Sequence, residues 1–165
     1  MKLVEIKDVR VGQVLERNRC IFVIEERTGV HNFAVSLYCH NHKPAPNDAY
    51  EALSMRERNV ATFDDCEIIG KIGITHCIEG NRLIELPRSS GFQVDDVVKF
   101  NWNDPRLYVI NREIDFGIKE IHPNNSCFEA TNDLYGSRQL VDFELKRVGI
   151  LGVTHEFIND KEVLS

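Results

Sequence analysis

The sequence predicts a mainly β protein of the α+β class, built from two tandem β-rich modules with one short helix in the first. Runs of Val, Ile, Phe and Tyr recur along the whole chain and are separated by turn residues, which is typical of short strands. One motif occurs once in each half, and weaker matches around it keep the same order. We therefore expect a first module over residues 1–86 and a diverged, pseudo-symmetric copy over residues 87–165.

The duplicated motif is the clearest of these signals. Residues 70–76 read GKIGITH, and residues 149–155 read GILGVTH. In both places a polar bend and a second apolar run follow, which predicts a β-hairpin that closes each module. In the later hairpin we expect Lys161 and Val163 in the second arm. Weaker matches pair residues 11–15 with 94–98, 22–24 with 108–110, and 46–52 with 123–130.

The remaining elements follow in order. In the first module, alternating apolar residues predict strands over residues 13–17, 20–27 and 31–40. Residues 49–59 are rich in helix formers, and Asn47 or Asp48 can cap them, so this segment is the predicted short helix. In the second module we expect strands over residues 97–102, 107–116 and 118–122, followed by a polar, irregular stretch over 127–140.

The opening of each module resembles the first two strands of SH3-like small β-barrels. The pattern is VGQVL at residues 11–15 with FVI at 22–24, and VDDVV at 94–98 with YVI at 108–110 after Pro105. The resemblance implies two tandem barrels of a kind that serves to recognise peptides, proteins or nucleic acids. Because many functions share this architecture, the resemblance concerns the fold more than the ligand.

The composition indicates which class of partner is favoured. Of the 165 residues, 42% are hydrophobic and 28% charged, which is ordinary for a globular protein. The net charge is −6, with 20 Lys and Arg against 26 Asp and Glu. Since a grip on a phosphate backbone needs a basic surface, a nucleic-acid partner is less favoured than a protein.

The cysteines and the N-terminus indicate a cytoplasmic protein. The five cysteines are odd in number and show no C-x-x-C spacing, which fits reduced thiols rather than disulfides. The first residues alternate polar and apolar types and lack the apolar core of a signal peptide. No apolar run is long enough to span a membrane.

The paired Thr-His dipeptides are the first candidate site. Thr75 and His76 recur as Thr154 and His155, and the alternation of a strand places both histidines among apolar neighbours. Two imidazoles that met at the junction of the modules could bind a metal, orient a phosphate, or act as acid and base. The alternative is structural: each histidine plugs its module and hydrogen-bonds backbone or the adjacent threonine.

A second cluster groups Cys39, His40 and His42. These are side chains that bind zinc, but the spacing matches no zinc signature, and Pro44 and Pro46 follow at once. We expect a solvated loop here and no cofactor.

Four residues are candidates for partner binding. Trp102 and Arg106 lie around a predicted strand end, and Tyr135 and Arg138 lie in a predicted exposed loop. Exposed aromatic residues beside arginine are common anchors at interfaces. The alternative is that Trp102 covers the junction between the modules.

The function expected from these features is recognition without catalysis. We expect a recognition or inhibitory protein that binds a macromolecular partner, foremost a protein, in the manner of a phage or mobile-element accessory factor. The alternative is a small-molecule or nucleotide binder, or a hydrolase, that uses the paired histidines. A third reading, a phosphate-backbone binder, requires Arg17, Arg19, Arg106 and Arg112 on one face. Edge strands left by the duplication would also allow a homodimer.

Overall fold

The computed structural model describes residues 1–40, 50–59, 65–88, 91–114, 127–133, 136–141 and 144–159, with the backbone alone at 39, 40 and 50–59. Within these ranges the protein is mainly β and has no helix. The strands are β1 (Lys2–Glu5), β2 (Gln13–Arg17), β3 (Cys20–Arg27), β4 (Asn32–His40), β5 (Tyr50–Asn59), β6 (Glu67–Lys71), β7 (His76–Glu79), β8 (Arg82–Glu85), β9 (Asp96–Phe100), β10 (Tyr108–Ile114), β11 (Cys127–Thr131), β12 (Ser137–Val141), β13 (Leu145–Ile150) and β14 (His155–Ile158).

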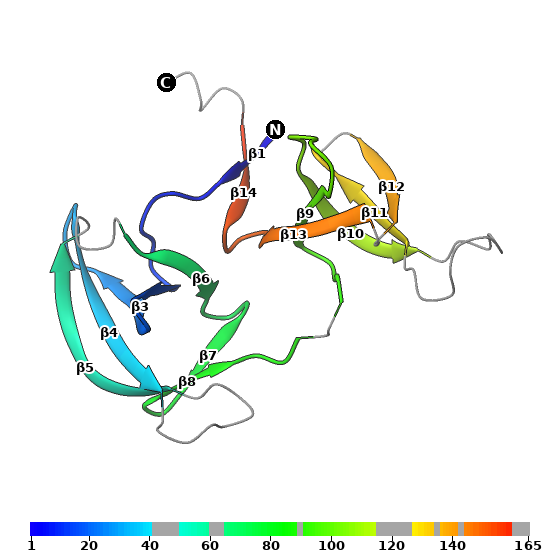
Figure 1. The fold of residues 1–165 in the computed structure, drawn as a ribbon. Coiled ribbons are helices and arrows are strands. Elements are labelled where there is room, and N and C mark those ends of the chain that lie inside the picture. Colours follow the sequence, from blue (N-terminus) through cyan, green and yellow to red (C-terminus); the bar gives the residue numbers. More distant parts are fainter. Residues whose placement is uncertain are drawn as a thin grey trace. The chain divides into compact units, whose positions relative to one another are not determined.

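The chain folds into two compact units. We call Lys7–Arg88 the N-terminal unit, and Met1–Ile6 together with Ser89–Ser165 the C-terminal unit. The first strand of the chain therefore belongs to the unit formed by the second half, and Figure 1 shows β1 beside β14.

The N-terminal unit contains a sheet of seven strands in the order β6-β2-β3-β4-β5-β8-β7. Every neighbouring pair in it is antiparallel. Alternation along β2 and β3 sends apolar side chains to both faces of the sheet, so the unit has two apolar clusters. One cluster contains Val14, Ile21, Val23, Tyr38 and Leu83, and the other Leu15, Phe22, Ile24, Phe33 and Val35.

The C-terminal unit contains a five-stranded sheet in the order β12-β11-β10-β9-β13 and the separate pair β1-β14. Its larger apolar cluster is formed by side chains of this sheet, which include Val98, Phe100, Tyr108, Ile110, Phe128 and Leu140. A second cluster gathers Leu3, Val97 and Val109, with Leu151 and Phe157 against it. Leu3, from the first strand of the chain, is thus part of this unit's core.

Both sheets are antiparallel and open. Within the described residues each sheet runs from one edge strand to another, so the closed barrel implied by the SH3-like resemblance is not seen there. The strand orders of the two sheets nevertheless correspond, since β6-β2-β3-β4-β5 in one matches β13-β9-β10-β11-β12 in the other.

A buried polar side chain begins the first sheet strand of each unit. Gln13 is 3% exposed and Asp96 is fully buried. The Arg10 N–H donates to Gln13 Oε1 at 2.8 Å, and the Gln93 N–H donates to Asp96 Oδ2 at 3.0 Å. These bonds close a turn just before β2 and before β9, where an unpaired backbone N–H would be unfavourable.

The predicted helix over residues 49–59 is wrong. Its residues 50–59 form strand β5, which pairs with β4 from Asn32↔Asn59 to His40↔Tyr50. Differences in helix propensity amount to only fractions of a kcal/mol per residue. A ladder of backbone hydrogen bonds along the whole of β4 outweighs them, and a scan of local composition cannot see that ladder.

Two expectations for the second half also need revision. The stretch over 127–140, predicted to be irregular, contains strands β11 and β12, which pair from Cys127↔Val141 to Thr131↔Ser137. The hairpin arm expected at Lys161 and Val163 lies outside the described residues. The strand that pairs with β14 is β1, from Lys2↔Ile158 to Glu5↔His155.

We predict that Leu3→Ala destabilises the C-terminal unit although Leu3 lies at the N-terminus of the chain. The Leu3 side chain is 9% exposed and belongs to the core of that unit, so its truncation should lower the free energy of unfolding by about 2 kcal/mol. Trp102 is the only tryptophan and lies in the same unit, so urea unfolding followed by its fluorescence measures the effect. Lys2→Ala, at an exposed position, is the control, and equal effects of the two changes would contradict the prediction.

Candidate functional site

The first repeated motif forms a tight turn between β6 and β7. The N–H groups of Ile74 and Thr75 both donate to the Lys71 carbonyl, at 3.1 and 3.0 Å. The Thr75 hydroxyl accepts the Lys71 N–H at 2.8 Å and lies 2.7 Å from Nδ1 of His76. One side chain therefore closes the turn and orients the imidazole.

The second motif forms the same turn between β13 and β14. The N–H groups of Val153 and Thr154 donate to the Ile150 carbonyl at 3.1 and 3.0 Å. The Thr154 hydroxyl accepts the Ile150 N–H at 2.8 Å and lies 2.8 Å from Nδ1 of His155. We call residues 70–76 and 149–155 the Thr-His turns.

A glycine at the start of each Thr-His turn leaves room for this arrangement. A Cβ added at Gly70 would lie 2.2 Å from Thr75 Oγ1 and 2.4 Å from His76 Nδ1. At Gly149 the corresponding distances, to Thr154 Oγ1 and His155 Nδ1, are 2.0 and 2.5 Å. Neither contact is sterically allowed, so any larger residue must displace the threonine and the histidine.

The two histidines are buried and favour their neutral form. His76 is 4% exposed and His155 is 7% exposed. Burial lowers the pKa of both imidazoles, and the glutamates opposite them in the strand pairs, Glu85 and Glu5, counter this only in part. Each threonine hydroxyl shares a hydrogen bond with Nδ1 of its histidine and lies 3.3 Å from the carbonyl of Lys71 or Ile150, so the neutral ring has a polar partner in either tautomer.

The arrangement within each unit matches the structural interpretation of the Thr-His dipeptides. The side chains of Thr75 and His76, and those of Thr154 and His155, hydrogen-bond to each other within their own turns. The hypothesis of a shared histidine site concerns the junction of the two units and stays a prediction.

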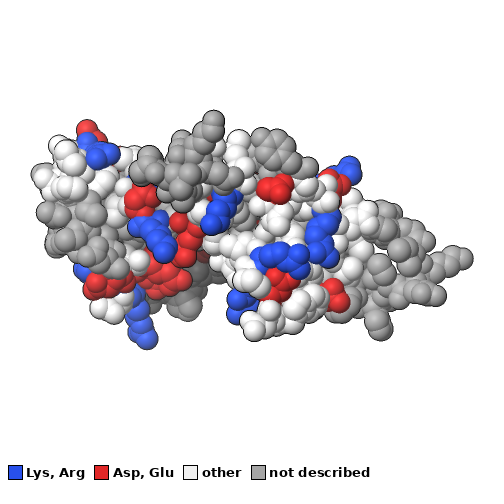
Figure 2. Space-filling view, turned by 90° about the horizontal axis from the view of Figure 1, so that it is seen from above, with Lys and Arg blue, Asp and Glu red and all other residues white. Residues whose placement is uncertain are grey.

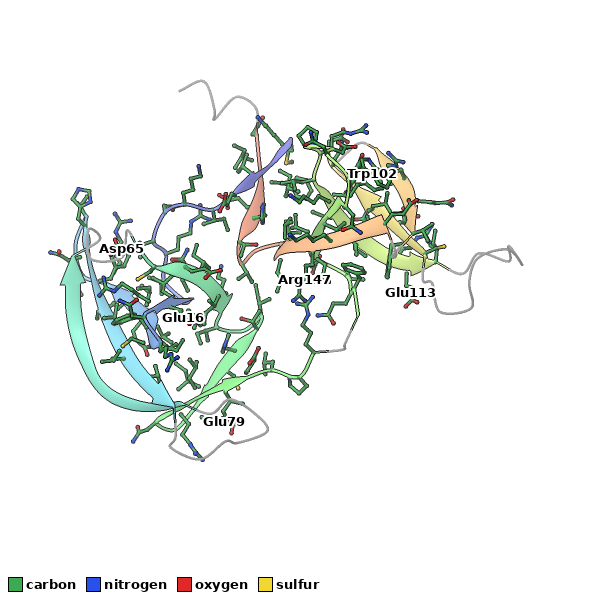
Figure 3. All side chains as sticks on the ribbon, viewed as in Figure 1. Glu16, Asp65, Glu79, Trp102, Glu113 and Arg147 are labelled. Carbon is green, nitrogen blue, oxygen red and sulfur yellow. The ribbon has the colours of Figure 1, made fainter. Side chains whose placement is uncertain are left out.

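The strongest candidate for a binding surface lies on the C-terminal unit, after β9. Trp102 is 53% exposed, and its ring stacks on Phe100 with centroids 4.4 Å apart and planes 10° apart. Phe100 is 4% exposed and packs edge-on against the buried ring of Tyr108. The indole is thus held by the core on one side and presented to solvent on the other (Figure 3).

An arginine from β12 covers the same aromatic rings. The Arg138 guanidinium lies 5.3 Å from the ring centroid of Phe100 and 5.5 Å from that of Tyr108. It also donates to the Tyr108 hydroxyl at 3.3 Å. Cation–π contacts of this kind orient the guanidinium while leaving part of it exposed.

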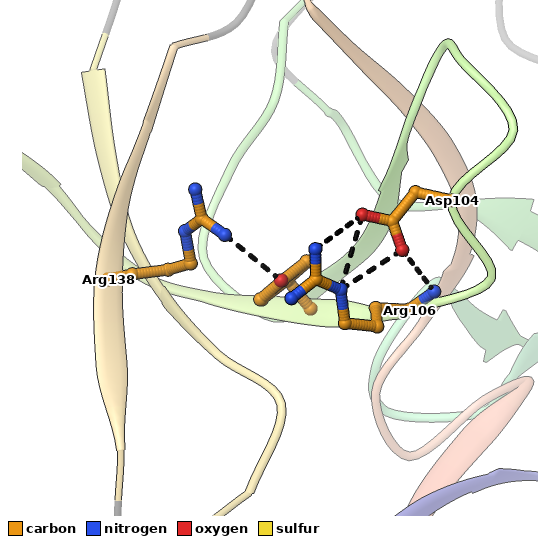
Figure 4. A network of polar contacts seen from close by, with 4 residues as sticks. Asp104, Arg106 and Arg138 are labelled. Carbon is orange, nitrogen blue, oxygen red and sulfur yellow. Dashed lines mark hydrogen bonds and ion pairs between the residues drawn. The ribbon is translucent and has the colours of Figure 1, made fainter.

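The loop that joins β9 to β10 contains Trp102 and is closed by Asp104 and Arg106. The Asp104 carboxylate accepts the backbone N–H of Arg106 at 3.0 Å and its Nη2 at 2.7 Å, as Figure 4 shows. This pairing with Arg106 lowers the pKa of Asp104 to about 2, so the carboxylate is ionised throughout the physiological range. We define the Trp102 surface as Phe100, Trp102, Asp104, Arg106, Tyr108 and Arg138.

The structure brings three of the four predicted partner-binding residues together. Trp102, Arg106 and Arg138 all belong to the Trp102 surface, whereas Tyr135 lies outside the described residues. Sequence reasoning placed Phe100 in the aromatic stretch around Trp102 without making it a binding residue, and it placed Tyr108 in a strand only. Their signal is the period-2 pattern of β9 and the start of β10, which places each on the buried face under the exposed tryptophan.

The side chains of the remaining candidates, Cys39, His40 and His42, are not among those that the structure describes. Cys39 and His40 are described by their backbone alone and His42 lies outside the described residues, so the metal hypothesis is not addressed there. Elsewhere in the described part of the chain, no group of three His, Cys, Asp or Glu side chains could hold a metal ion. Among the described residues, no helix is long and apolar enough to cross a membrane.

Two of the four arginines required by a phosphate-backbone binder form ion pairs with acidic side chains. Arg106 pairs with Asp104 at 2.7 Å, and Arg112 pairs with Glu129 at 2.6 Å. On the face drawn in Figure 2, basic and acidic side chains are interspersed, and the described residues form no continuous basic field.

Comparison with models of protein families, with curated proteins and with solved structures finds no match to this chain.

We predict that Gly149→Ala destabilises the C-terminal unit by about 2 kcal/mol or more, because the new methyl group overlaps Thr154 and His155. Urea unfolding followed by Trp102 fluorescence measures the loss. Gly91→Ala is the matched control in the same unit, since a Cβ there meets no atom within 4 Å. If both alanine variants are equally stable, the turn does not require its glycine.

We predict that the free energy of unfolding falls as the pH drops below about 6.5. The folded-state pKa of His76 and His155 is lowered, so the unfolded chain takes up protons first. Stability is full above the unfolded pKa of about 6.5 and declines as the pH falls toward the folded pKa, by at most about 1.4 kcal/mol per pH unit for each histidine.

Urea unfolding at pH 7.5, 6.5 and 5.5 tests this dependence. The double variant His76→Asn with His155→Asn keeps an acceptor for each threonine and should flatten the profile. His31→Asn, at an exposed position, should leave it unchanged. An unaltered slope in the double variant would assign the dependence to other groups.

Proposed function

We propose that this protein is a recognition protein that binds a partner protein through the Trp102 surface and catalyses no reaction. The observation that carries the proposal is the 53% exposed Trp102 stacked on the buried Phe100. An aromatic side chain packed on the core loses little entropy on binding, and tryptophan and arginine are enriched among the residues that carry most of the binding energy of interfaces.

The charges of the surface suggest the chemistry of the partner. Arg106 and Arg138 outnumber Asp104, so the surface carries a local positive charge on a chain whose net charge is −6. Asp104 already neutralises Arg106, which leaves the guanidinium of Arg138, above Phe100 and Tyr108, as the group best placed to meet an anion. The partner segment we propose has a carboxylate next to an aromatic or proline side chain, the carboxylate for Arg138 and the apolar group for Trp102.

We further propose that the two units are diverged copies of one small SH3-like β module and that the C-terminal copy acquired the binding surface. The corresponding strand orders and the two Thr-His turns support this relation. The N-terminal unit has Arg17 and Asn18 where the corresponding strand end of the C-terminal unit has Phe100 and Asn101. An aromatic platform is therefore a property of the second copy.

A displayed library of random peptides, selected on the intact protein, tests the proposed function. We expect the selected peptides to combine Asp or Glu with an aromatic residue or proline. Trp102→Ala should weaken their binding roughly 30-fold, the effect of an interface hot spot, as measured by calorimetry. Arg138→Lys should weaken binding to a smaller extent, because lysine keeps the charge and loses the planar guanidinium.

The matched control is Val94→Ala, which trims another exposed apolar side chain, 51% exposed, in the same unit. It should leave the affinity unchanged. Circular dichroism establishes that each variant is folded. Peptides that bind Trp102→Ala and the unaltered protein equally well would contradict the proposal.

A further inference from the structure

Two short strands far apart in the sequence resemble each other. Strand β1 reads KLVE and is followed by Ile6, while β8 reads RLIE and is followed by Leu86. Each has a basic residue, leucine, a β-branched residue, glutamate and an aliphatic residue in that order. The two strands lie in different units.

The two strands also pair in the same register. In the C-terminal unit Glu5 lies opposite His155 and Leu3 opposite Phe157. In the N-terminal unit the corresponding pairs are Glu85 with His76 and Leu83 with Ile78. After each strand one more bond follows, from Ile6 N–H to Thr154 O and from Leu86 N–H to Thr75 O, both at 2.8 Å.

The leucine of each strand occupies the same place in its core. Leu83 is fully buried and Leu3 is 9% exposed. Both pack among aliphatic and aromatic side chains from corresponding strands and turns. Around Leu83 these are Val14, Val23, Ile72 and Ile78, and around Leu3 they are Val97, Val109, Leu151 and Phe157.

The position of each of these strands in the sequence differs from that of the rest of its unit. Strand β8 precedes β9 to β14 in the sequence but completes the N-terminal unit. Strand β1 precedes β2 to β7 but completes the C-terminal unit. If the halves of the chain begin at Lys2 and Arg82, each half gives its first strand to the unit formed by the other.

We propose that the β14 edge is a strand-acceptor site specific for a basic–Leu–Val/Ile–Glu segment, and that the chain is a strand-exchanged pair of related halves fused into one polypeptide. The binding partner of each half is thus the first strand of the other. Exchange of an identical element between two copies is a low-cost route to a dimer, and fusion makes that exchange intramolecular. The proposal is independent of the Trp102 surface.

A permuted chain tests this inference. Residues 2–6 are removed from the N-terminus, and the segment of residues 80–86 (GNRLIEL), which contains the β7–β8 turn and β8, is attached after Ile158 in place of residues 159–165. We expect the transplanted segment to fill the β14 edge, with a Tm reported by Trp102 fluorescence within about 5 °C of that of the original chain. A second permutant with a six-residue Gly/Ser linker in place of the turn removes any dependence on turn geometry.

Two control variants show how far the Tm falls when the β14 edge is left empty. Deletion of residues 2–6 alone should lower the Tm by about 15 °C or abolish the Trp102 transition. The permutant with Leu83→Asp in the transplanted copy should show the same loss of Tm as the deletion. The reason is that an aspartate cannot be buried in the apolar cluster that Leu3 fills in the original chain. Loss of the Trp102 transition in both permutants, the one with the native turn and the one with the Gly/Ser linker, would overturn the proposal if the far-UV signal of the N-terminal unit is retained. So would a permutant that tolerates Leu83→Asp.

Discussion

The threonine hydroxyl of each Thr-His turn is the interaction on which the rest of the structure depends. It accepts a backbone N–H at the end of one strand and meets the imidazole that begins the next. This bond reverses the chain and aims β7 and β14 along the edges where β8 and β1 pair. Because the hydroxyl and the imidazole lie over the backbone of Gly70 or Gly149, no side chain is tolerated there.

The requirement for histidine follows from the same geometry. A neutral imidazole fills an apolar site and still forms a hydrogen bond with the threonine hydroxyl through Nδ1, which an aliphatic side chain cannot do. The glutamate opposite each histidine lies toward the solvent edge of the strand pair and reduces the penalty of protonation only in part. Within its own unit, each histidine of the repeated pair therefore has a structural role, as the hydrogen-bond partner of its threonine.

The Trp102 surface shows how this fold holds an exposed aromatic side chain. Alternation along β9 buries Val98 and Phe100, and the chain leaves the sheet directly afterwards, so Trp102 can lie on the ring of Phe100 instead of entering the core. The bond from Asp104 to the Arg106 backbone then shapes the return into β10. The site is built on the strands that form the core, and its rigidity is that of the core.

The sequence by itself determined the mainly β class, the repeated turn and the residue types around Trp102. Strand alternation, glycine spacing and a tryptophan near an arginine are local patterns. They can be recognised without knowing which segments are neighbours in the folded protein. Only the tertiary structure decided that residues 50–59 are a strand, since the β4 ladder outweighs their helix propensity. It alone placed Lys2–Glu5 against β14 and brought Arg138 over Phe100, because pairing between segments far apart in the chain depends on which edge and which ring the folded unit leaves open.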